Sequence, residues 1–249
     1  MPADLPAQFE RTRILLTSDE MARLTQAHVL VAGLGGVGSY CAEALARAGV
    51  GKLTLVDHDV VAASNINRQL PALLSTVGQP KAELMRARIM DINPACELRL
   101  IREFLTPDNV SERVPADADY VIDCIDSLNC KVALVAMSVQ RGLRVASSMG
   151  AGNKVDPTRI RLADIAKTHQ CPLASVMRKR LRKRGIYKGV LTVFSDEPGR
   201  APLAPQPVEG SGRARAVNGT VSYMPPLFGL MLAGAVVQQL IAAPAIKAA

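Results

Sequence analysis

Apolar and polar positions alternate along the first 150 residues in a pattern that predicts strands and helices in turn. Continuous apolar runs predict buried strands near residues 28–33, 52–57, 97–103, 119–123 and 143–148. Helix-like segments lie between them near residues 37–48, 80–91 and 128–141, and the second ends at Asn93-Pro94 because proline cannot continue a helix. Strands that alternate with helices form parallel sheets. The pattern predicts an α/β fold with a doubly wound, mostly parallel, Rossmann-like sheet.

Beyond residue 150 the alternation weakens, and the chain predicts a C-terminal extension of the sheet domain. A basic stretch before residue 189 is expected to be helical, and GVLTVFS at 189–195 predicts a strand. The proline- and glycine-rich segment at 196–212 predicts a loop or flap.

The final apolar segment, residues 225–246, is long enough to raise a membrane helix. Gln238, Gln239 and Pro244 interrupt it and no cation cluster flanks it, so we expect a buried helix packed on the sheet, without membrane insertion. The first 16 residues hold acids and prolines where a secretory signal needs a basic start and an apolar stretch. The five cysteines include no C-x-x-C pair. These features predict a cytoplasmic protein.

A glycine cluster, Gly33 to Gly38, follows the first predicted strand and matches G-x-G-x-x-G. Its glycines let the turn adopt positive φ and let backbone N–H groups approach a phosphate at the next helix's N-terminus. Asp57 ends the second strand, where it is placed to accept hydrogen bonds from ribose hydroxyls. The motif alone favours a nicotinamide or flavin enzyme, but it leaves ATP open.

Two cations follow Asp57 in the sequence and help to decide which nucleotide the site binds. Arg68 and Lys81 lie in SNINRQ and VGQPKAE, beside Asn65 and Gln69. A dehydrogenase has little need for them, whereas ATP needs cations to stabilise charge on leaving pyrophosphate. An isolated arginine or lysine is also commonly a solvated surface residue.

Two acids, Asp123 and Asp126, stand at the carboxyl end of another predicted strand, in VIDCIDS. Ligands of open sheets bind at such strand ends. One acid there can hold Mg²⁺ against phosphate oxygens.

The ordered motifs GLGGVGS, LVDHD, SNINRQ, VGQPKAE, INP and DCIDS together resemble the E1-like, ThiF-type superfamily of ATP-dependent adenylating enzymes, which includes activators of ThiS and MoaD-type sulfur carriers. Residues 150–186 resemble one branch, the tRNA threonylcarbamoyladenosine dehydratases, which cyclise the modified adenosine next to the anticodon and consume ATP. The resemblance therefore implies ATP. It also implies one integrated domain, with an ATP-binding core over residues 9–150 and an extension over 151–249.

Site residues follow from the resemblance, position by position. It implies Gly35, Gly36 and Gly38 at the phosphates, Asp57 at the ribose, Asn65, Arg68, Gln69 and Lys81 at the triphosphate, and Asp126 as the magnesium ligand. Arg13, with Arg11 as the alternative alignment, resembles an arginine that reaches the phosphates of a neighbouring subunit. A homodimer is therefore implied.

The formal net charge of +8 is concentrated in one region, because no acid occurs between Asp164 and Asp196. RKRLRKRG at 178–185 predicts a tRNA-contacting segment, although most charge runs are solvated helix faces. The predicted tRNA contacts are Arg178, Arg180, Arg182, Lys183 and Arg184.

The implied reaction is adenylation of the free carboxylate of threonylcarbamoyladenosine by Mg·ATP, followed by ring closure and net loss of water. It requires no protein nucleophile, because the attacking group is held in the same nucleoside. Cys171 and the neighbouring His169 are accordingly expected to be packed or incidental. One alternative is a sulfur-carrier adenylyltransferase, for which a sulfur-relay protein is a candidate partner, although the two C-x-x-C zinc pairs usual there are missing. The other is a non-catalytic tRNA-binding or scaffold protein.

Overall fold

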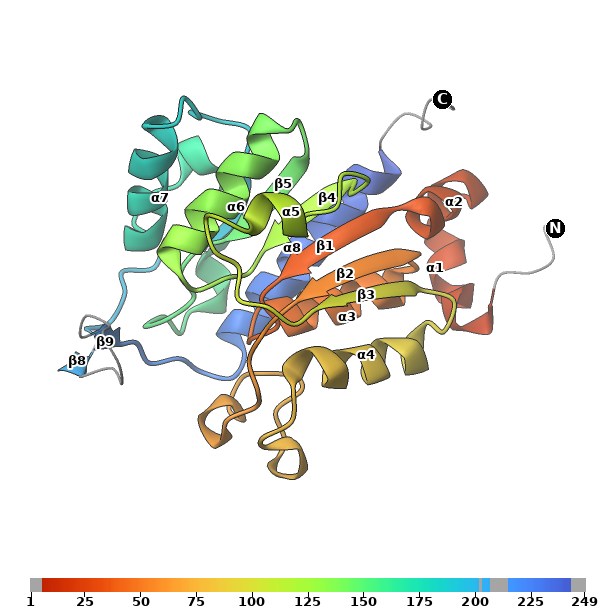
Figure 1. Cartoon of the computed structure of the whole chain (residues 1–249), viewed down its shortest axis with the longest axis horizontal. Coiled ribbons are helices and arrows are strands. Elements are labelled where there is room, and N and C mark those ends of the chain that lie inside the picture. The colour runs from red at the N-terminus through yellow and green to blue at the C-terminus, as the bar shows by residue number, and fades with distance from the viewer. Residues whose placement is uncertain (1–5, 202, 207–214, 243–249) are drawn as a thin grey trace.

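The computed structural model describes residues 6–201, 203–206 and 215–242, and within them seven strands form one sheet (Figure 1). Its order is β3-β2-β1-β4-β5-β7-β6. All neighbours pair in parallel except β6, which runs antiparallel to β7 at the edge. The predicted doubly wound, mostly parallel sheet is confirmed. The strands are β1 His28–Ala32, β2 Lys52–Val56, β3 Glu97–Ile101, β4 Tyr120–Asp123, β5 Arg144–Ser148, β6 Ile160–Asp164 and β7 Leu191–Ser195.

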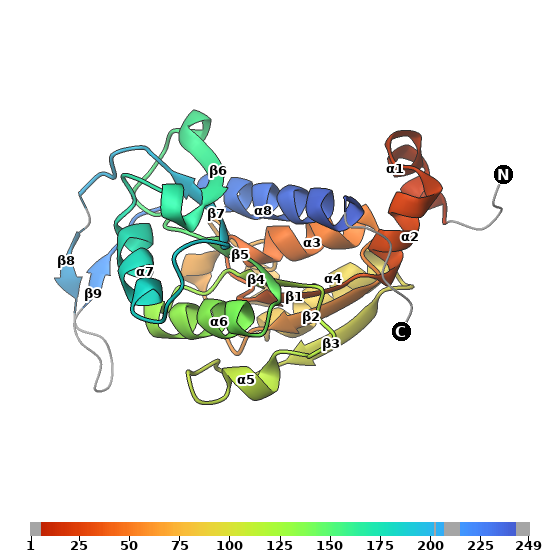
Figure 2. The ribbon, with the colours of Figure 1, turned by 90° about the horizontal axis from the view of Figure 1, so that it is seen from above.

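Helices cover both faces of the sheet, as Figure 2 shows. One apolar core lies under α2, α3, α4 and α8, and a second lies under α5, α6 and α7. Because both faces are covered, the central strands β1 and β4 are buried along their whole length, which explains their continuous apolar runs. The helices are α1 Glu10–Leu15, α2 Ser18–Gln26, α3 Gly38–Ala48, α4 Lys81–Ile92, α5 Val110–Arg113, α6 Leu128–Gln140, α7 Pro172–Arg182 and α8 Met224–Ile241.

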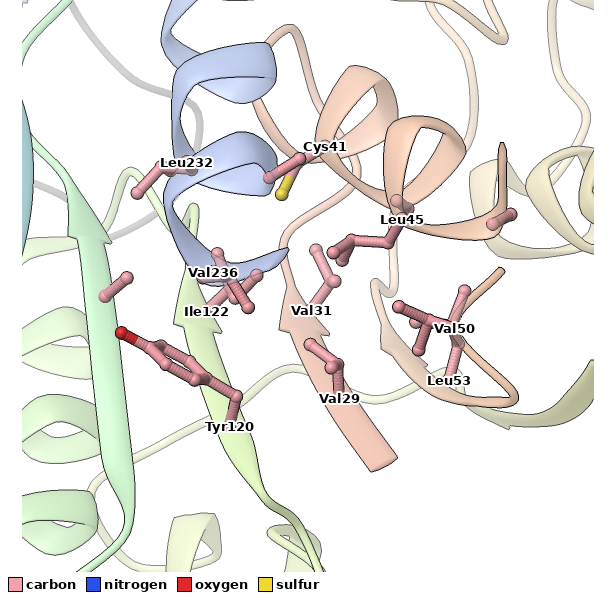
Figure 3. Close-up of a cluster of buried hydrophobic side chains, with 14 of the residues drawn as sticks. Val29, Val31, Cys41, Leu45, Val50, Leu53, Tyr120, Ile122, Leu232 and Val236 are labelled. Carbon is pink, nitrogen blue, oxygen red and sulfur yellow. The ribbon is translucent and has the colours of Figure 1, made fainter. Parts of the chain in front are cut away.

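The C-terminal apolar segment forms α8, which packs against α3 and the sheet (Figure 3). Leu232 and Val236 lie in the core, and the Tyr120 hydroxyl donates a hydrogen bond of 2.9 Å to Gln239 Oε1. Within the described residues, α8 is the one helix whose length and hydropathy would suit a membrane span, and 56% of it is buried inside the protein. This is the buried helix that the sequence predicts.

The segment at 196–212 departs from the prediction made from its sequence. The segment at 196–212, predicted as a loop, contains strand β8 (Leu203–Gln206), which pairs with β9 (Arg215–Val217), so the prediction is wrong at those four residues. Prolines suggest a loop, yet a two-stranded ribbon has free edges where a missing N–H is tolerated. Residues 202 and 207–212 of this segment lie outside the described residues.

Helix α2 is not among the helices predicted from the apolar pattern, although the sequence carries a signal for its start. Thr17 Oγ1 accepts from Glu20 N at 3.3 Å, and Glu20 Oε2 accepts from Thr17 N at 2.7 Å. This is a capping box, whose Thr-x-x-Glu spacing predicts a helix start.

Candidate active site

A cleft of about 810 Å³ opens at the carboxyl ends of the strands, where the order turns from β1 to β4. Open α/β sheets bind ligands at this switch point, because the loops after the two strands diverge there. The cleft is lined by the glycine loop and by residues that follow β2, β4 and β5, and its far wall comes from the segment before α8. Stretches far apart in the sequence therefore share one hollow.

The glycine loop owes its shape to missing side chains. Gly33 has φ +88°, and a Cβ there would lie 2.7 Å from Cys124 O. Gly35 and Gly36 line the cleft, where their backbone is open to a ligand. Gly38 has another function: its Cβ would lie 1.7 Å from Gly33 O, so its absence lets α3 start against the loop. Gly38 is not among the lining residues, and its predicted place at the phosphates stays a prediction.

Asp57 fixes the glycine loop. Its Oδ2 accepts from Leu34 N at 2.6 Å, and its Oδ1 accepts from Asp59 N at 2.8 Å. Burial raises the pKa of the Asp57 carboxyl, since the charged form loses water. A carboxylate has about four acceptor positions, so two bonds leave capacity for a ribose hydroxyl. Ribose binding by Asp57, which lines the cleft, stays a prediction.

Lys81 is held at the cleft by Asp59, an acid of the LVDHD motif for which the sequence predicts no role. Its Nζ lies 2.8 Å from Asp59 Oδ2, and only 4% of Lys81 is exposed. Asp59 O also accepts from Lys81 N at 3.0 Å, which ties α4 to the end of β2. Nearby, the ring of His58 meets the ring of Phe104 edge to face, with centroids 4.8 Å apart. Phe104 lines the cleft but follows a strand without any motif to mark it.

Arg68 reaches the cleft from the loop after β2, and its phosphate contact stays a prediction. Its Nη1 donates to Ser64 O at 2.9 Å and to Asn67 Oδ1 at 2.8 Å. The Nδ2 of Asn67 donates in turn to Thr220 O at 3.2 Å, in the far wall. A single amide therefore connects the arginine to the segment before α8. Asn67 lies inside the SNINRQ motif, but the motif alone does not predict this role for it.

Gln69 and Asn65 differ in what their side chains face. Gln69 is 9% exposed and lines the cleft, and its Oε1 has no hydrogen-bond partner. A buried polar atom without a partner is costly, so it fits a site that a ligand completes. The Oδ1 of Asn65 instead accepts from Ala62 N at 3.1 Å, and Asn65 is not among the lining residues. Its contact with the triphosphate stays a prediction.

The two acids at the carboxyl end of β4, Asp123 and Asp126, have separate environments. Asp123 is fully buried and bonds to Lys131 Nζ at 2.7 Å, to Ser147 Oγ at 2.5 Å and to Ile125 N at 3.1 Å. Asp126 is exposed and lines the cleft. Of the two, Asp126 alone is open to a ligand, which supports its choice as the magnesium ligand.

The far wall of the cleft is fastened by Asn153, which follows β5 in the left-handed region at φ 61°. Its Nδ2 donates to Asn218 Oδ1 at 2.8 Å, and its Oδ1 accepts from Gly219 N at 2.8 Å. Its own N donates to Gly219 O at 2.8 Å. Tyr223 adds a bond of 2.9 Å to Val155 O. The extension therefore supplies an ordered wall of the cleft.

Arg13 lies far from this cleft in the same chain. The cleft lies at the start of α3. Phe9, just before α1, packs at the opposite end of α3, where a Cβ built on Gly49 would lie 3.6 Å from its ring (Figure 2). Arg13 is not among the lining residues. An approach of Arg13 to a bound nucleotide would require a second copy of the chain.

The basic segment forms the end of α7, and its cations fall into two groups. Arg178 is half-buried and donates to Thr168 O at 2.9 Å, so it holds the preceding loop. Arg180, Arg182, Lys183 and Arg184 are exposed, and Leu181 anchors the helix in the core. Cys171, before α7, is buried.

The comparisons with known proteins agree with this geometry. A model described as the ThiF family matches residues 9–248. The chain belongs to the ThiF family. Within it, the chain is 44% identical over 240 residues to the tRNA threonylcarbamoyladenosine dehydratase of Bacillus subtilis, and the match spans 94% of each. The structure of Escherichia coli tRNA N6-threonylcarbamoyladenosine dehydratase in complex with ATP matches with a TM-score of 0.86 at 37% identity, over 97% of this chain and 96% of that one. The resemblance predicted from the motifs is confirmed.

Proposed function

We propose that this ThiF-family chain catalyses the ATP-dependent, cyclising dehydration of N6-threonylcarbamoyladenosine in tRNA, a ligase-type reaction that begins with carboxylate adenylation. The observation that carries the proposal is the cleft, which brings Arg68, Gln69, Lys81 and Asp126 together with a wall from the extension. Similarity to the Bacillus subtilis dehydratase spans both halves of the cleft, since it covers 94% of the chain.

ATP fits the half of the cleft next to the glycine loop. Backbone N–H groups at the start of α3 favour phosphate, because the helix dipole is positive there. Arg68 and Lys81 supply the charge that a leaving pyrophosphate needs. The E. coli relative was solved in complex with ATP.

Magnesium fits the donor atoms on the same side. The Asp126 carboxylate and the unpartnered Oε1 of Gln69 are oxygens, the ligand type that Mg²⁺ prefers. Asp126 would hold the ion, which neutralises charge on the phosphates when it is bound.

The chemistry follows from the substrate's own groups. The threonyl carboxylate attacks the α-phosphorus, pyrophosphate leaves with its electron pair, and Arg68 and Lys81 stabilise that charge. The carbamoyl group then loses a proton and attacks the activated carbonyl carbon, and AMP leaves with one of the former carboxylate oxygens. The nucleoside has lost one water. The chain binds and orients the two partners, since proximity within one nucleoside supplies the nucleophile.

We include a homodimer in the proposal because two exposed apolar sets lie at separate places on the chain. Ile14 and Leu15 in α1 are 71% and 84% exposed, and Leu74, in the loops between β2 and α4, is 86% exposed. Leu73 beside it is also exposed. If α1 of one copy packs on these loops of another, Arg13 approaches the neighbour's cleft. We also propose that the reaction takes place in the cytoplasm.

The test is to incubate the purified chain with Mg·ATP and tRNA that carries threonylcarbamoyladenosine. Mass spectrometry of the digested tRNA should show a nucleoside lighter by one water, with AMP released in equal amount. Adenylation of a sulfur-carrier protein instead would establish the adenylyltransferase alternative. Binding of tRNA without any ATP turnover would establish the non-catalytic alternative.

A further inference from the structure

A second hollow, of about 260 Å³, lies between α6 and α7. Half of its lining residues carry positive charge and none is acidic, which is unusual for a surface where ion pairs are common elsewhere on the chain. Its walls come from the loop before α5, from α6 and from the end of α7. The lining residues are Pro107, Asn129, Val132, Arg180, Lys183 and Arg184.

The hollow begins directly beside the cleft. Asn129 follows Asp126 by three positions, and Pro107 follows Leu105 by two, while Asp126 and Leu105 both line the cleft. The start of α7 returns to the cleft as well, because Leu173 lines it. The helix is about 15 Å long at 1.5 Å per residue, and it crosses the start of α6 at the cleft end of the sheet (Figure 2). A polymer that enters the cleft from the side of α7 would pass this hollow.

One cation of the hollow is held in place by a hydrogen bond. Arg180 Nη1 donates to Asn129 Oδ1 across the α6–α7 contact, so its guanidinium stays beside another residue of the lining. Arg178 differs, since its Nη1 is engaged by Thr168. Arg182 is exposed and does not line the hollow. The fold therefore divides the five cations predicted as tRNA contacts into three that line the hollow and two, Arg178 and Arg182, that do not.

The size and chemistry of the hollow favour one phosphodiester. Pockets for whole small molecules span roughly 300 to 1,000 Å³, which exceeds this hollow. Arginine forks match phosphate oxygens, and Val132 offers an apolar contact for a sugar. Such contacts fix the position of a nucleic acid without reading its sequence.

We propose that Arg180, Lys183 and Arg184 bind one backbone phosphate of the tRNA strand that carries the modified adenosine, while that nucleoside occupies the cleft. This inference rests on the proposed function and deepens it. It assigns RNA docking to three cations at one hollow and removes Arg178 and Arg182 from the docking set.

The test compares two variants of equal charge. Arg180→Gln/Lys183→Gln/Arg184→Gln alters the hollow, and Lys179→Gln/Arg182→Gln/Lys188→Gln removes three exposed cations that do not line it. The probe is an anticodon stem-loop RNA with threonylcarbamoyladenosine, and its Kd is measured over a KCl series. We expect the first variant to bind the RNA about tenfold or more weakly than the wild type. The slope of log K against log salt should become shallower by about 0.7 to 0.9, the value for one lost phosphate contact. The control should lose less than about threefold.

A second probe locates the phosphate. Stem-loop RNAs that carry one uncharged methylphosphonate linkage, moved stepwise on both sides of the modified adenosine, are bound to the wild type and to the first variant. At one position, the uncharged linkage should weaken RNA binding by the wild type as much as the triple substitution in the hollow does. The same linkage should not weaken RNA binding by that triple variant any further. Equal losses in the two triple variants, or no linkage with this behaviour, would overturn the proposal.

Turnover separates this inference from the proposed function. If the wild type yields no lighter nucleoside, the proposed function fails, whatever the binding data show. If the wild type converts the nucleoside and the two triple variants bind RNA alike, only the phosphate site fails. Circular dichroism melting of both variants checks the fold, since glutamine at exposed positions should leave it unchanged.

Discussion

Asn153 donates from its Nδ2 to Asn218 Oδ1 over 2.8 Å, and this contact joins the loop after β5 to the segment that walls the cleft. Asn153 adopts φ 61°, which few residues other than glycine and asparagine tolerate. One residue therefore combines a turn in the backbone with a side chain that fixes the wall.

The Asn153→Gly variant retains the positive φ and loses the side-chain bonds. We expect the KM for tRNA to rise about tenfold, the equivalent of one hydrogen bond of roughly 1 to 1.5 kcal/mol, with the KM for ATP unchanged. Gln170→Gly, at φ 53° in an exposed position, is the control for the backbone alone. A rise in both KM values would show that Asn153 only stabilises the fold.

The buried pair of Lys131 and Asp123 should be a large contributor to stability. Lys131→Met removes the cation and leaves Asp123 buried with one partner fewer, which typically costs about 3 to 5 kcal/mol in the free energy of unfolding. Urea denaturation followed by circular dichroism measures it. Arg113→Ala, which breaks the exposed pair with Glu103, should cost about 0 to 1 kcal/mol. Equal losses in the two variants would contradict this account of the pair.

Asp126→Ala should remove adenylation without affecting the fold, because the side chain is exposed. We expect pyrophosphate exchange to fall on the order of 100-fold or more, while the melting temperature stays within about 2 °C. Asp91→Ala, at an exposed position on α4, is the matched control. Normal exchange in the Asp126 variant would exclude it from the phosphate site.

Complementation tests whether two copies share a site. Arg13→Ala and Asp126→Ala chains should each be inactive alone. Mixed dimers contain one site in which both residues are intact, so about a quarter of wild-type activity should return after statistical mixing if Arg13 acts across the dimer. Verified mixed dimers without activity would place Arg13 outside the neighbour's cleft.

ATP should protect one thiol. Cys124 is half-buried at the cleft, whereas the other four cysteines are buried, and burial raises the pKa of Cys96 to about 11. A thiol reagent at pH 8 should therefore modify Cys124 first, since the thiolate is the reactive form. Saturating ATP should slow that modification about tenfold or more, as read by peptide mass spectrometry. Equal rates with and without ATP would place the nucleotide away from Cys124.

The sequence predicted what local patterns determine. The strands β1 and β4 were predicted because burial on both faces makes their runs continuously apolar, and Arg68, Lys81 and Asp126 came from ordered motifs. The contact between Asp123 and Lys131 depends on how α6 packs on the sheet. No local pattern encodes it.

The same limit explains why the far wall of the cleft could not be predicted from the sequence. Asn153 and Asn218 are 65 positions apart, so their contact depends on tertiary packing that no local pattern specifies. The position of Asn65 illustrates the converse: a motif selected the residue, but the side chain caps its own turn.

The two hydrogen bonds of the Asn67 side chain connect Arg68 with the far wall of the cleft. It accepts from Arg68 through Oδ1 and donates to Thr220 O through Nδ2, so a shift of either neighbour strains the other bond. A ligand that draws Arg68 toward a phosphate therefore also acts on the opposite wall, where the RNA would sit. Linkage requires the effect to be reciprocal: any factor by which nucleotide changes the affinity for RNA is the factor by which RNA changes the affinity for nucleotide.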